Sequence, residues 1–181
     1  MTKRGRDFLL GIGERAPEFL LSGVLDKKIM DFSLADFKGK WVVLFFYPLD
    51  FSFVCLTEIR GFSEKLADFK NANAALLAVS VDSVYSHKEW ISNSLGEIGF
   101  PLLSDLKKNV CESYEVLKKD EGVAFRATFI IDPEGIIQSV AINNLNVGRS
   151  VSETFRVLKA LQTGGLCAVE WKPGEKNIKP A

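Results

Sequence analysis

Several kinds of functional site are excluded by what this sequence lacks. Its 181 residues contain a single histidine, His87, so a metal site built from several histidines is impossible. Lys plus Arg number 23 and Asp plus Glu number 23, which leaves no excess of positive charge for binding nucleic acid. No glycine-rich phosphate loop or cluster of metal ligands stands out along the chain. The sequence therefore implies no nucleic-acid partner, no metal and no prosthetic group.

Long apolar runs and cysteine pairs are also missing. The longest apolar run, residues 41–47, is far shorter than the roughly 20 residues that cross a bilayer, and no secretory apolar stretch follows the basic N-terminus. We therefore expect a cytoplasmic protein that does not enter a membrane. Three cysteines, Cys55, Cys111 and Cys167, cannot form a disulfide framework, and no Cys-x-x-Cys motif is present. The absence of that motif disfavours a dithiol oxidoreductase.

The chain has the composition of a globular protein, and strand and helix patterns alternate along it. Apolar residues make up 47% of the chain and include 14 Phe, enough for one domain with its own core. Continuous apolar runs predict buried strands over residues 41–47 and 74–81. Apolar residues three and four apart predict a helix over residues 57–71, on which Ile59, Phe62, Leu66 and Phe69 share one face.

The remaining segments complete an alternating order. We expect a hairpin over residues 18–32, a helix that Asp82 or Ser83 caps and that runs through Trp90, a weaker helix over 105–117, strands over 127–132 and 135–141, and a last helix from Ser152 to Gly164. This order predicts an α/β fold, a three-layer sandwich of thioredoxin type. Residues 1–165 would form the domain, and residues 166–181, which lack periodicity, a C-terminal arm.

Cys55 is the residue with the clearest chemical signal. It stands between a predicted buried strand and a predicted helix, where unpaired backbone N–H groups and the helix dipole favour the nucleophilic thiolate. Most free cysteines simply pack in the core, and we expect Cys111, between Val110 and Glu112 in a predicted helix, to do so. Position and flanking sequence favour a reactive thiol at Cys55.

The residues around Cys55 are similar to a known signature. Residues 45–58, Phe-Phe-Tyr-Pro-Leu-Asp-Phe-Ser-Phe-Val-Cys-Leu-Thr-Glu, resemble the Pro-x-x-x-(Thr/Ser)-x-x-Cys motif of the peroxiredoxins. The resemblance continues through residues 80–83, 101–105, 126–132, 147–150 and 166–167, and so covers nearly the whole chain. The chain resembles most the typical 2-Cys peroxiredoxins, which include the C component of alkyl hydroperoxide reductase.

This resemblance implies a role for three residues of the motif. Cys55 would attack the peroxide O–O bond and become a sulfenic acid. Pro48 would fix the backbone and shield the sulfur from water. Ser52, where the family more often has Thr, would offer a hydroxyl to the thiolate and the peroxide.

The resemblance also implies three charged residues around the sulfur. Arg126 would supply a permanent positive charge that favours the thiolate and polarises the peroxide oxygens. Glu58 would orient the Arg126 guanidinium, and Arg149 would be a second cation nearby.

Cys167 is implied to be the resolving cysteine. It would condense with the sulfenic acid of Cys55 on the partner subunit and form an intersubunit disulfide, although Leu166-Cys167-Ala168 replaces the usual Val-Cys-Pro and Leu56 replaces a Pro. The family further implies hydrogen peroxide and organic hydroperoxides as substrates, no cofactor, and a homodimer or a ring of dimers such as a decamer. The disulfide would be reduced by an external dithiol, either thioredoxin or a dedicated flavoprotein disulfide reductase.

Two other functions stay open at this point. A chaperone-like assembly could coexist with peroxidase activity. A cysteine hydrolase would need a histidine base, for which His87 is the only candidate, but its place near a predicted helix start is more typical of capping or a solvated surface. On that interpretation His87→Ala would abolish a hydrolase and leave a peroxidase almost unchanged.

Overall fold

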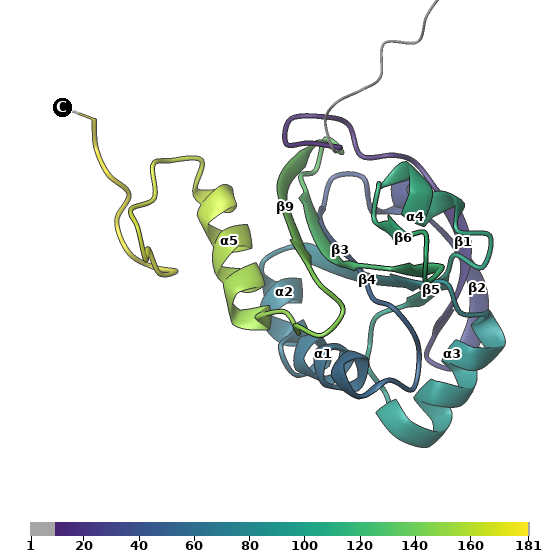
Figure 1. Ribbon diagram of the computed structural model, residues 1–181. Helices are drawn as coiled ribbons and strands as arrows, with labels where there is room; N and C mark the ends of the chain where they lie inside the picture. The colour runs from purple at the N-terminus through teal and green to yellow at the C-terminus, as the bar shows by residue number, and fades with distance from the viewer. Residues whose placement is uncertain (1–9, 181) are drawn as a thin grey trace, which may run out of the picture.

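A seven-stranded mixed sheet forms the centre of the fold in the computed structural model, which describes residues 10–180 (Figure 1). Its strands are β1 (Leu20–Leu25), β2 (Lys28–Ser33), β3 (Trp41–Phe46), β4 (Ala74–Ser80), β5 (Leu102–Ser104), β8 (Arg126–Ile131) and β9 (Ile137–Asn143). Across the sheet they follow the order β2-β1-β5-β4-β3-β8-β9. Strands β3, β4 and β5 run parallel to one another, and the other pairings are antiparallel. A separate pair consists of β6 (Leu117–Lys118) and β7 (Val123–Ala124).

Helices and short turns cover both faces of this sheet. They are η1 (Leu34–Phe37), α1 (Phe53–Glu64), α2 (Leu66–Asn71), α3 (Val84–Trp90), η2 (Ile91–Leu95), α4 (Asn109–Ser113) and α5 (Val151–Thr163). One face packs against Ile59 of α1, Phe69 of α2, Trp90 of α3 and Leu158 of α5. The other face packs against η1, α4 and the segment around β6. The three layers confirm the predicted thioredoxin-like sandwich.

The apolar run in β3 explains why the sheet is buried on both sides. Successive side chains of a strand point to opposite faces. Val42, Leu44 and Phe46 therefore lie in one core cluster, and Val43 and Phe45 lie in the other. Neither face of β3 meets solvent, which is why the sequence shows no polar alternation there.

Three predicted helices differ from the observed ones. The helix predicted over residues 57–71 is two helices separated at Lys65, whose φ of −98° and ψ of 7° depart from helical values, and α1 begins four residues earlier than predicted, at Phe53. The helix predicted over residues 105–117 was wrong in extent, because only α4 forms there. The last helix begins at Val151, one residue before the predicted start at Ser152, and is capped by the Ser150 side chain, which accepts from the Glu153 N–H.

Asp105 and Glu115 mark the two ends of the short helix around Cys111. Its carboxylate accepts hydrogen bonds from the N–H groups of Val110 and Cys111, so Asp105 caps the helix from outside it. Glu115, with a φ of 56°, then turns the chain away after α4. The sequence analysis also did not predict β5, a strand of only three residues.

The C-terminal arm lies on the outer side of α5 (Figure 1). Gly164 ends α5 in a left-handed conformation with a φ of 65°, and a backbone bridge then pairs Leu166 with Ile178. Trp171 of the arm is only 2% exposed, so this segment is folded against the helix although its sequence lacks periodicity. Its separation from the domain at residue 165 stays a prediction. Among residues 10–180, no helix has both the length and the apolar character needed to cross a bilayer.

Candidate active site

Cys55 lies in the first turn of α1, directly after the loop that follows β3. Ser52 is the N-cap residue, with a φ of −82° and a ψ of 146°, and its carbonyl accepts the first helical bond from the Leu56 N–H. The backbone N–H groups before Leu56 have no partner within the helix, as at every helix start. Cys55 itself is fully buried, which closes its sulfur off from bulk water, and its place in the first turn is at the positive end of the helix dipole.

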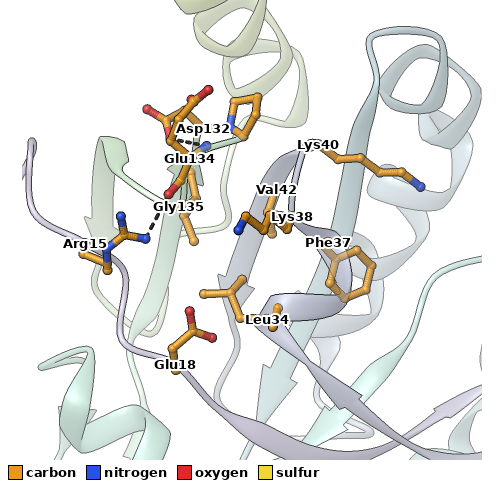
Figure 2. A pocket seen from close by; sticks show the side chains of 13 residues that line it. Arg15, Glu18, Leu34, Phe37, Lys38, Lys40, Val42, Asp132, Glu134 and Gly135 are labelled. Atoms are coloured by element: carbon orange, nitrogen blue, oxygen red, sulfur yellow. Dashed lines mark hydrogen bonds between the residues drawn. The ribbon is translucent and has the colours of Figure 1, made fainter.

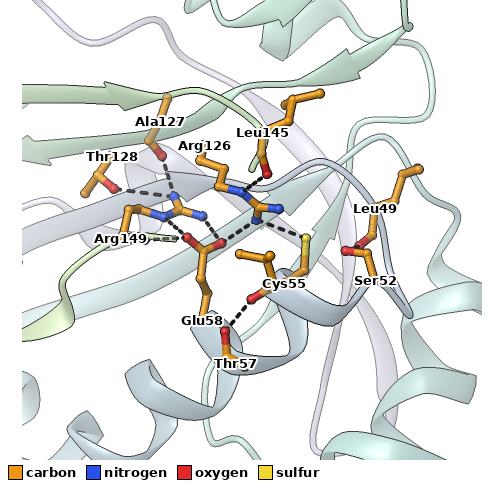
Figure 3. A network of polar contacts seen from close by, with 11 residues as sticks. Leu49, Ser52, Cys55, Thr57, Glu58, Arg126, Ala127, Thr128, Leu145 and Arg149 are labelled. Carbon is orange, nitrogen blue, oxygen red and sulfur yellow. Dashed lines mark hydrogen bonds and ion pairs between the residues drawn. The ribbon is translucent and has the colours of Figure 1, made fainter. Parts of the chain in front are cut away.

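Arg126 brings a guanidinium to this sulfur from β8. It is the first residue of that strand and is only 3% exposed. Its Nη1 lies 3.2 Å from Cys55 Sγ and 2.8 Å from Glu58 Oε2, and its Nε donates to the Leu145 carbonyl at 2.6 Å (Figure 3). The guanidinium thus places a fixed positive charge in direct contact with the sulfur.

Glu58 holds Arg126 and Arg149 together from α1, one turn after Cys55. Arg149 donates to Glu58 Oε1 from Nε at 2.9 Å and to Oε2 from Nη2 at 2.7 Å, and its Nη1 donates to the Ala127 carbonyl at 2.8 Å. Burial alone would raise the pKa of Glu58, but the hydrogen bonds and charge of Arg149, followed by the charge of Arg126, hold that pKa below its ordinary value. Two cations share one anion, which leaves a net positive charge beside the sulfur.

The polar residues of the preceding loop do not bond the sulfur. Ser52 Oγ donates to the Leu49 carbonyl at 3.0 Å, and Figure 3 shows this pair beside Cys55. Pro48 is buried at the start of the loop, next to Tyr47. The structure therefore brings Cys55, Glu58, Arg126 and Arg149 into one network and leaves the expected roles of Ser52 and Pro48 as predictions.

A buried carboxylate, Asp50, anchors this loop and was missed by the sequence analysis. It accepts hydrogen bonds from Tyr47 Oη at 2.8 Å, Ser86 Oγ at 2.7 Å and His87 Nδ1 at 2.9 Å. Its own N–H donates to Asp82 Oδ2 at 2.9 Å. Burial raises the pKa of Tyr47 well above 10.0, so the phenol keeps its proton and donates it. The one available signal was an isolated aspartate within an apolar stretch.

His87 corrects an expectation based on sequence position. It is fully buried, so surface solvation and helix capping were the wrong explanations; Ser83 caps α3 instead. Its Nδ1 bonds Asp50, and its Nε2 has no hydrogen-bond partner within residues 10–180. In the described part of the chain, Cys55 is hydrogen-bonded to Arg126 and His87 is hydrogen-bonded to Asp50. This arrangement does not support a Cys–His hydrolase pair. Because His87 supports the loop, its replacement by Ala is no longer expected to leave a peroxidase unchanged.

The other two cysteines differ sharply in environment. Cys111 is fully buried in the core, as expected, and its pKa is raised by burial and then by the charge of Asp105. Cys167 is half-buried beyond α5, with its Sγ 3.6 Å from Thr163 Oγ1 and 3.8 Å from the Ala160 carbonyl. All three thiols are free in this structure.

A pocket of about 210 Å³ lies at the opposite end of strands β3 and β8 from Cys55 (Figure 2). It is lined by Arg15, Glu18 and Lys38 together with the turn that follows β8. This turn comes after the C-terminal end of β8, whereas Arg126 and the sulfur lie at the N-terminal end of the same strand. The pocket is therefore separate from the cysteine site.

Comparison with known proteins places this site in a family. The sequence profile described as the AhpC/TSA family matches residues 12–140. The chain belongs to this family. It is 48% identical to the chloroplastic 2-Cys peroxiredoxin BAS1 of Spinacia oleracea. The alignment covers 99% of this chain and 71% of that protein. As a 2-Cys peroxiredoxin, the protein is a thiol-dependent peroxidase, which confirms the family and the enzyme class expected from the sequence.

Solved peroxiredoxin structures agree with the fold. The reduced 2-Cys peroxiredoxin of Plasmodium vivax superposes with a TM-score of 0.90 at 39% identity, covering 94% of this chain and 93% of that one. AhpC of Mycobacterium tuberculosis gives a TM-score of 0.82 at 40% identity, over 91% of this chain and 99% of its own. The peroxiredoxin variant of the thioredoxin fold is thus shared over nearly the full length.

Proposed function

We propose that Cys55 is the peroxide-reacting residue of this peroxidase and that Cys167 of the partner subunit resolves its oxidised form. The observation that carries the proposal is the fully buried Cys55 sulfur at the start of α1, with Arg126 Nη1 at 3.2 Å. Arg126 is itself fixed by Glu58 and by the Leu145 carbonyl, so the positive charge is in place before a peroxide enters.

The first step oxidises Cys55 by two electrons. The thiolate attacks one peroxide oxygen, an S–O bond forms and the O–O bond breaks, and the departing oxygen takes a proton to become water or an alcohol. Negative charge develops on that departing oxygen. Arg126 Nη2 has no hydrogen-bond partner in the described part of the chain, which leaves it available to donate to the peroxide oxygens, and Ser52 would be a second donor after rotating away from Leu49.

The second step consumes the sulfenic acid. The Cys167 thiol of the partner attacks the Cys55 sulfur, an S–S bond forms, the S–O bond breaks, and the hydroxyl leaves as water with the thiol proton. An external dithiol then reduces this disulfide by two successive exchanges and is itself oxidised. Thiol chemistry thus completes the cycle without a cofactor.

The protein partners follow from the family. Proteins of this family generally form homodimers and take electrons from thioredoxin or from a dedicated flavoprotein. For this chain we propose a homodimer that assembles into rings, with hydrogen peroxide and organic hydroperoxides as substrates. A chaperone-like activity of the ring and a cytoplasmic location stay predictions of the sequence.

Peroxide consumption by single-cysteine variants tests the assignment of Cys55. With a thioredoxin system as electron donor, Cys55→Ser should lose essentially all turnover of hydrogen peroxide. Cys111→Ser, which replaces a fully buried thiol far from solvent, is the matched control and should keep turnover. Turnover that survives in Cys55→Ser would contradict the proposal, because another residue would then reduce the peroxide.

A further inference from the structure

One face of the Arg149 guanidinium lies against the ring of Phe45. The Arg149 Cζ is 5.1 Å from the centroid of that ring, within the distance of about 6 Å at which the negative face of an aromatic ring attracts a cation. Phe45 is fully buried in β3, and the Arg149 side chain is 4% exposed. Because little water competes for this contact, the cation gains more from the ring than an exposed cation would.

Hydrogen bonds hold the edge of the same guanidinium. Its Nε and Nη2 donate to Glu58, and its Nη1 donates to the Ala127 carbonyl at 2.8 Å and lies 3.4 Å from Thr128 Oγ1 (Figure 3). Thr128 is the residue of β8 that pairs with Phe45 of β3 in the sheet. Elements α1 and β8 therefore fix the edge of the guanidinium, and β3 supplies a ring to one of its faces.

The charges around Glu58 explain why an aromatic face matters at this place. Arg126 and Arg149 share the single carboxylate of Glu58, so one positive charge is in excess among these three buried groups. Burial penalises a charge that is not fully compensated. The ring of Phe45 offers negative π density to Arg149 without adding a second anion. A carboxylate in that place would cancel the positive charge beside the sulfur, whereas a ring leaves the charge intact.

Two aromatic neighbours fix the ring of Phe45 in turn. It is stacked on Phe62 of α1, with the ring centroids 4.2 Å apart and an angle of 17° between the planes. Phe100 packs against it in an edge-on arrangement, with centroids 5.9 Å apart at 65°. Phe62 lies one helical turn after Glu58, so the helix that carries the carboxylate also carries the ring that holds Phe45. The ring and the carboxylate therefore keep a fixed relation to each other.

We propose that Phe45 is a positioning residue of the peroxidase reaction, which acts by holding the Arg149 guanidinium against its π face. Arg149 binds both oxygens of Glu58. Glu58 orients Arg126, whose Nη1 lies 3.2 Å from the Cys55 sulfur. When the ring attracts Arg149 less strongly, Glu58 is shared less evenly and draws Arg126 toward itself, away from the sulfur and the peroxide oxygens. This inference rests on the proposed role of Cys55.

A series of fluorinated phenylalanines at position 45 tests the proposal. Each added ring fluorine weakens the negative face of the ring and leaves its shape nearly unchanged, so the series varies the electrostatic attraction at nearly constant packing. In the Cys167→Ser variant, where the sulfenic acid accumulates, we expect the rate constant for its formation by hydrogen peroxide to fall stepwise, by about three- to tenfold in the pentafluorinated protein. Quenching with a reagent that traps sulfenic acid, followed by mass spectrometry, measures that rate.

The same replacements at Phe46 and at Phe62 are matched controls. Phe46 follows Phe45 in β3, is equally buried, and packs against the rings of Tyr114 and Phe129. Phe62 shares the stacked pair, but the guanidinium lies over the ring of Phe45. Neither control series should lower the rate constant. An equal fall at positions 45 and 62 would overturn the proposal, because aromatic stacking would then account for the effect.

The parent protein of the series distinguishes the two levels of inference. Circular dichroism first establishes that each protein is folded. If the parent with ordinary Phe45 forms no sulfenic acid at Cys55, the proposed role of Cys55 is wrong and the role of Phe45 fails with it. If the parent forms sulfenic acid and the rate constant is the same throughout the series at position 45, only the role of Phe45 is wrong.

Discussion

The Cys55 sulfur acquires its surroundings from side chains that three separate elements supply. Arg126 comes from β8, Glu58 from α1 and Arg149 from the turn before α5. Glu58 is the shared partner, since each of its oxygens is bonded to a guanidinium. A buried carboxylate between two arginines links the stability of the fold to the charge at the reactive centre.

Glu58→Gln should therefore change stability in a way that depends on pH. The lowered pKa of Glu58 means that its ionised form stabilises the folded state above its ordinary value of 4.5, and that this contribution is lost as the pH falls through the folded-state pKa. Removing the charge leaves two buried arginines without their anion, at a cost of about 3 kcal/mol at pH 7.

Urea unfolding at pH 7 and at pH 4 measures this dependence. The difference in unfolding free energy between the two proteins should be large at pH 7 and smaller in acid. Asp120→Asn, which changes a fully exposed carboxylate paired with Lys118, is the control and should show little effect at either pH. A difference that stays constant with pH would show that Glu58 is not ionised in the folded protein.

At the scale of elements, the loop between β3 and α1 depends on a contact with α3. The Asp50 carboxylate accepts hydrogen bonds from three donors, and two of them, Ser86 and His87, belong to α3. The same loop contains Phe51 in a left-handed conformation with a φ of 58°, which local sequence alone would not maintain. Hydrogen bonds between this loop and α3 thus help to fix where α1 begins and where Cys55 lies.

Asp50→Ala should destabilise the fold and impair the peroxidase together. The hydroxyls of Tyr47 and Ser86 and the Nδ1 of His87 would lose their acceptor, and one buried unsatisfied group costs about 1–3 kcal/mol. We expect a loss of at least 3 kcal/mol in urea unfolding and a lower kcat/KM for peroxide under conditions where the variant is folded. Asp31→Ala, on the exposed face of β2, should change stability by less than about 0.5 kcal/mol. An unaltered kcat/KM in folded Asp50→Ala would show that the loop is positioned without this carboxylate.

Short-range sequence patterns were enough to predict several elements of the sheet. The strands β3 and β4 and the hairpin of β1 and β2 were predicted, because apolar runs and turn residues specify them. The break at Lys65 was not, since Leu66 and Phe69 continue the apolar period across it. Resemblance to the family named Glu58, Arg126 and Arg149 before their contacts were seen. The bond between Asp50 and His87 joins residues far apart in sequence, and no periodicity reveals such a pair.

At the scale of the whole molecule, the two proposed reaction partners belong to different parts of the fold. Cys55 lies in the first turn of α1, whereas Cys167 lies in the segment that follows α5. Neither is disulfide-bonded in a single chain. This separation makes the pairing of the two sulfurs a question about the assembly of subunits.

Mixing two inactive variants tests the intersubunit bridge. Cys55→Ser and Cys167→Ser should each form no covalent dimer after treatment with peroxide. Subunits of the two variants that are refolded together should form one disulfide in each mixed dimer, because Cys55 of one chain meets Cys167 of the other. Non-reducing electrophoresis with differently tagged chains reads the result. A bridge within one chain would give no product in the mixture and would refute the intersubunit arrangement.

The complete burial of Cys111 has a practical consequence for labelling the protein. A maleimide dye added to the reduced, native enzyme reaches no thiol that lies wholly inside the core, whereas Cys167 is partly accessible beside α5. A fluorophore can therefore be attached to the arm of the otherwise unaltered chain, and its anisotropy will report how freely that segment moves before any peroxide is added.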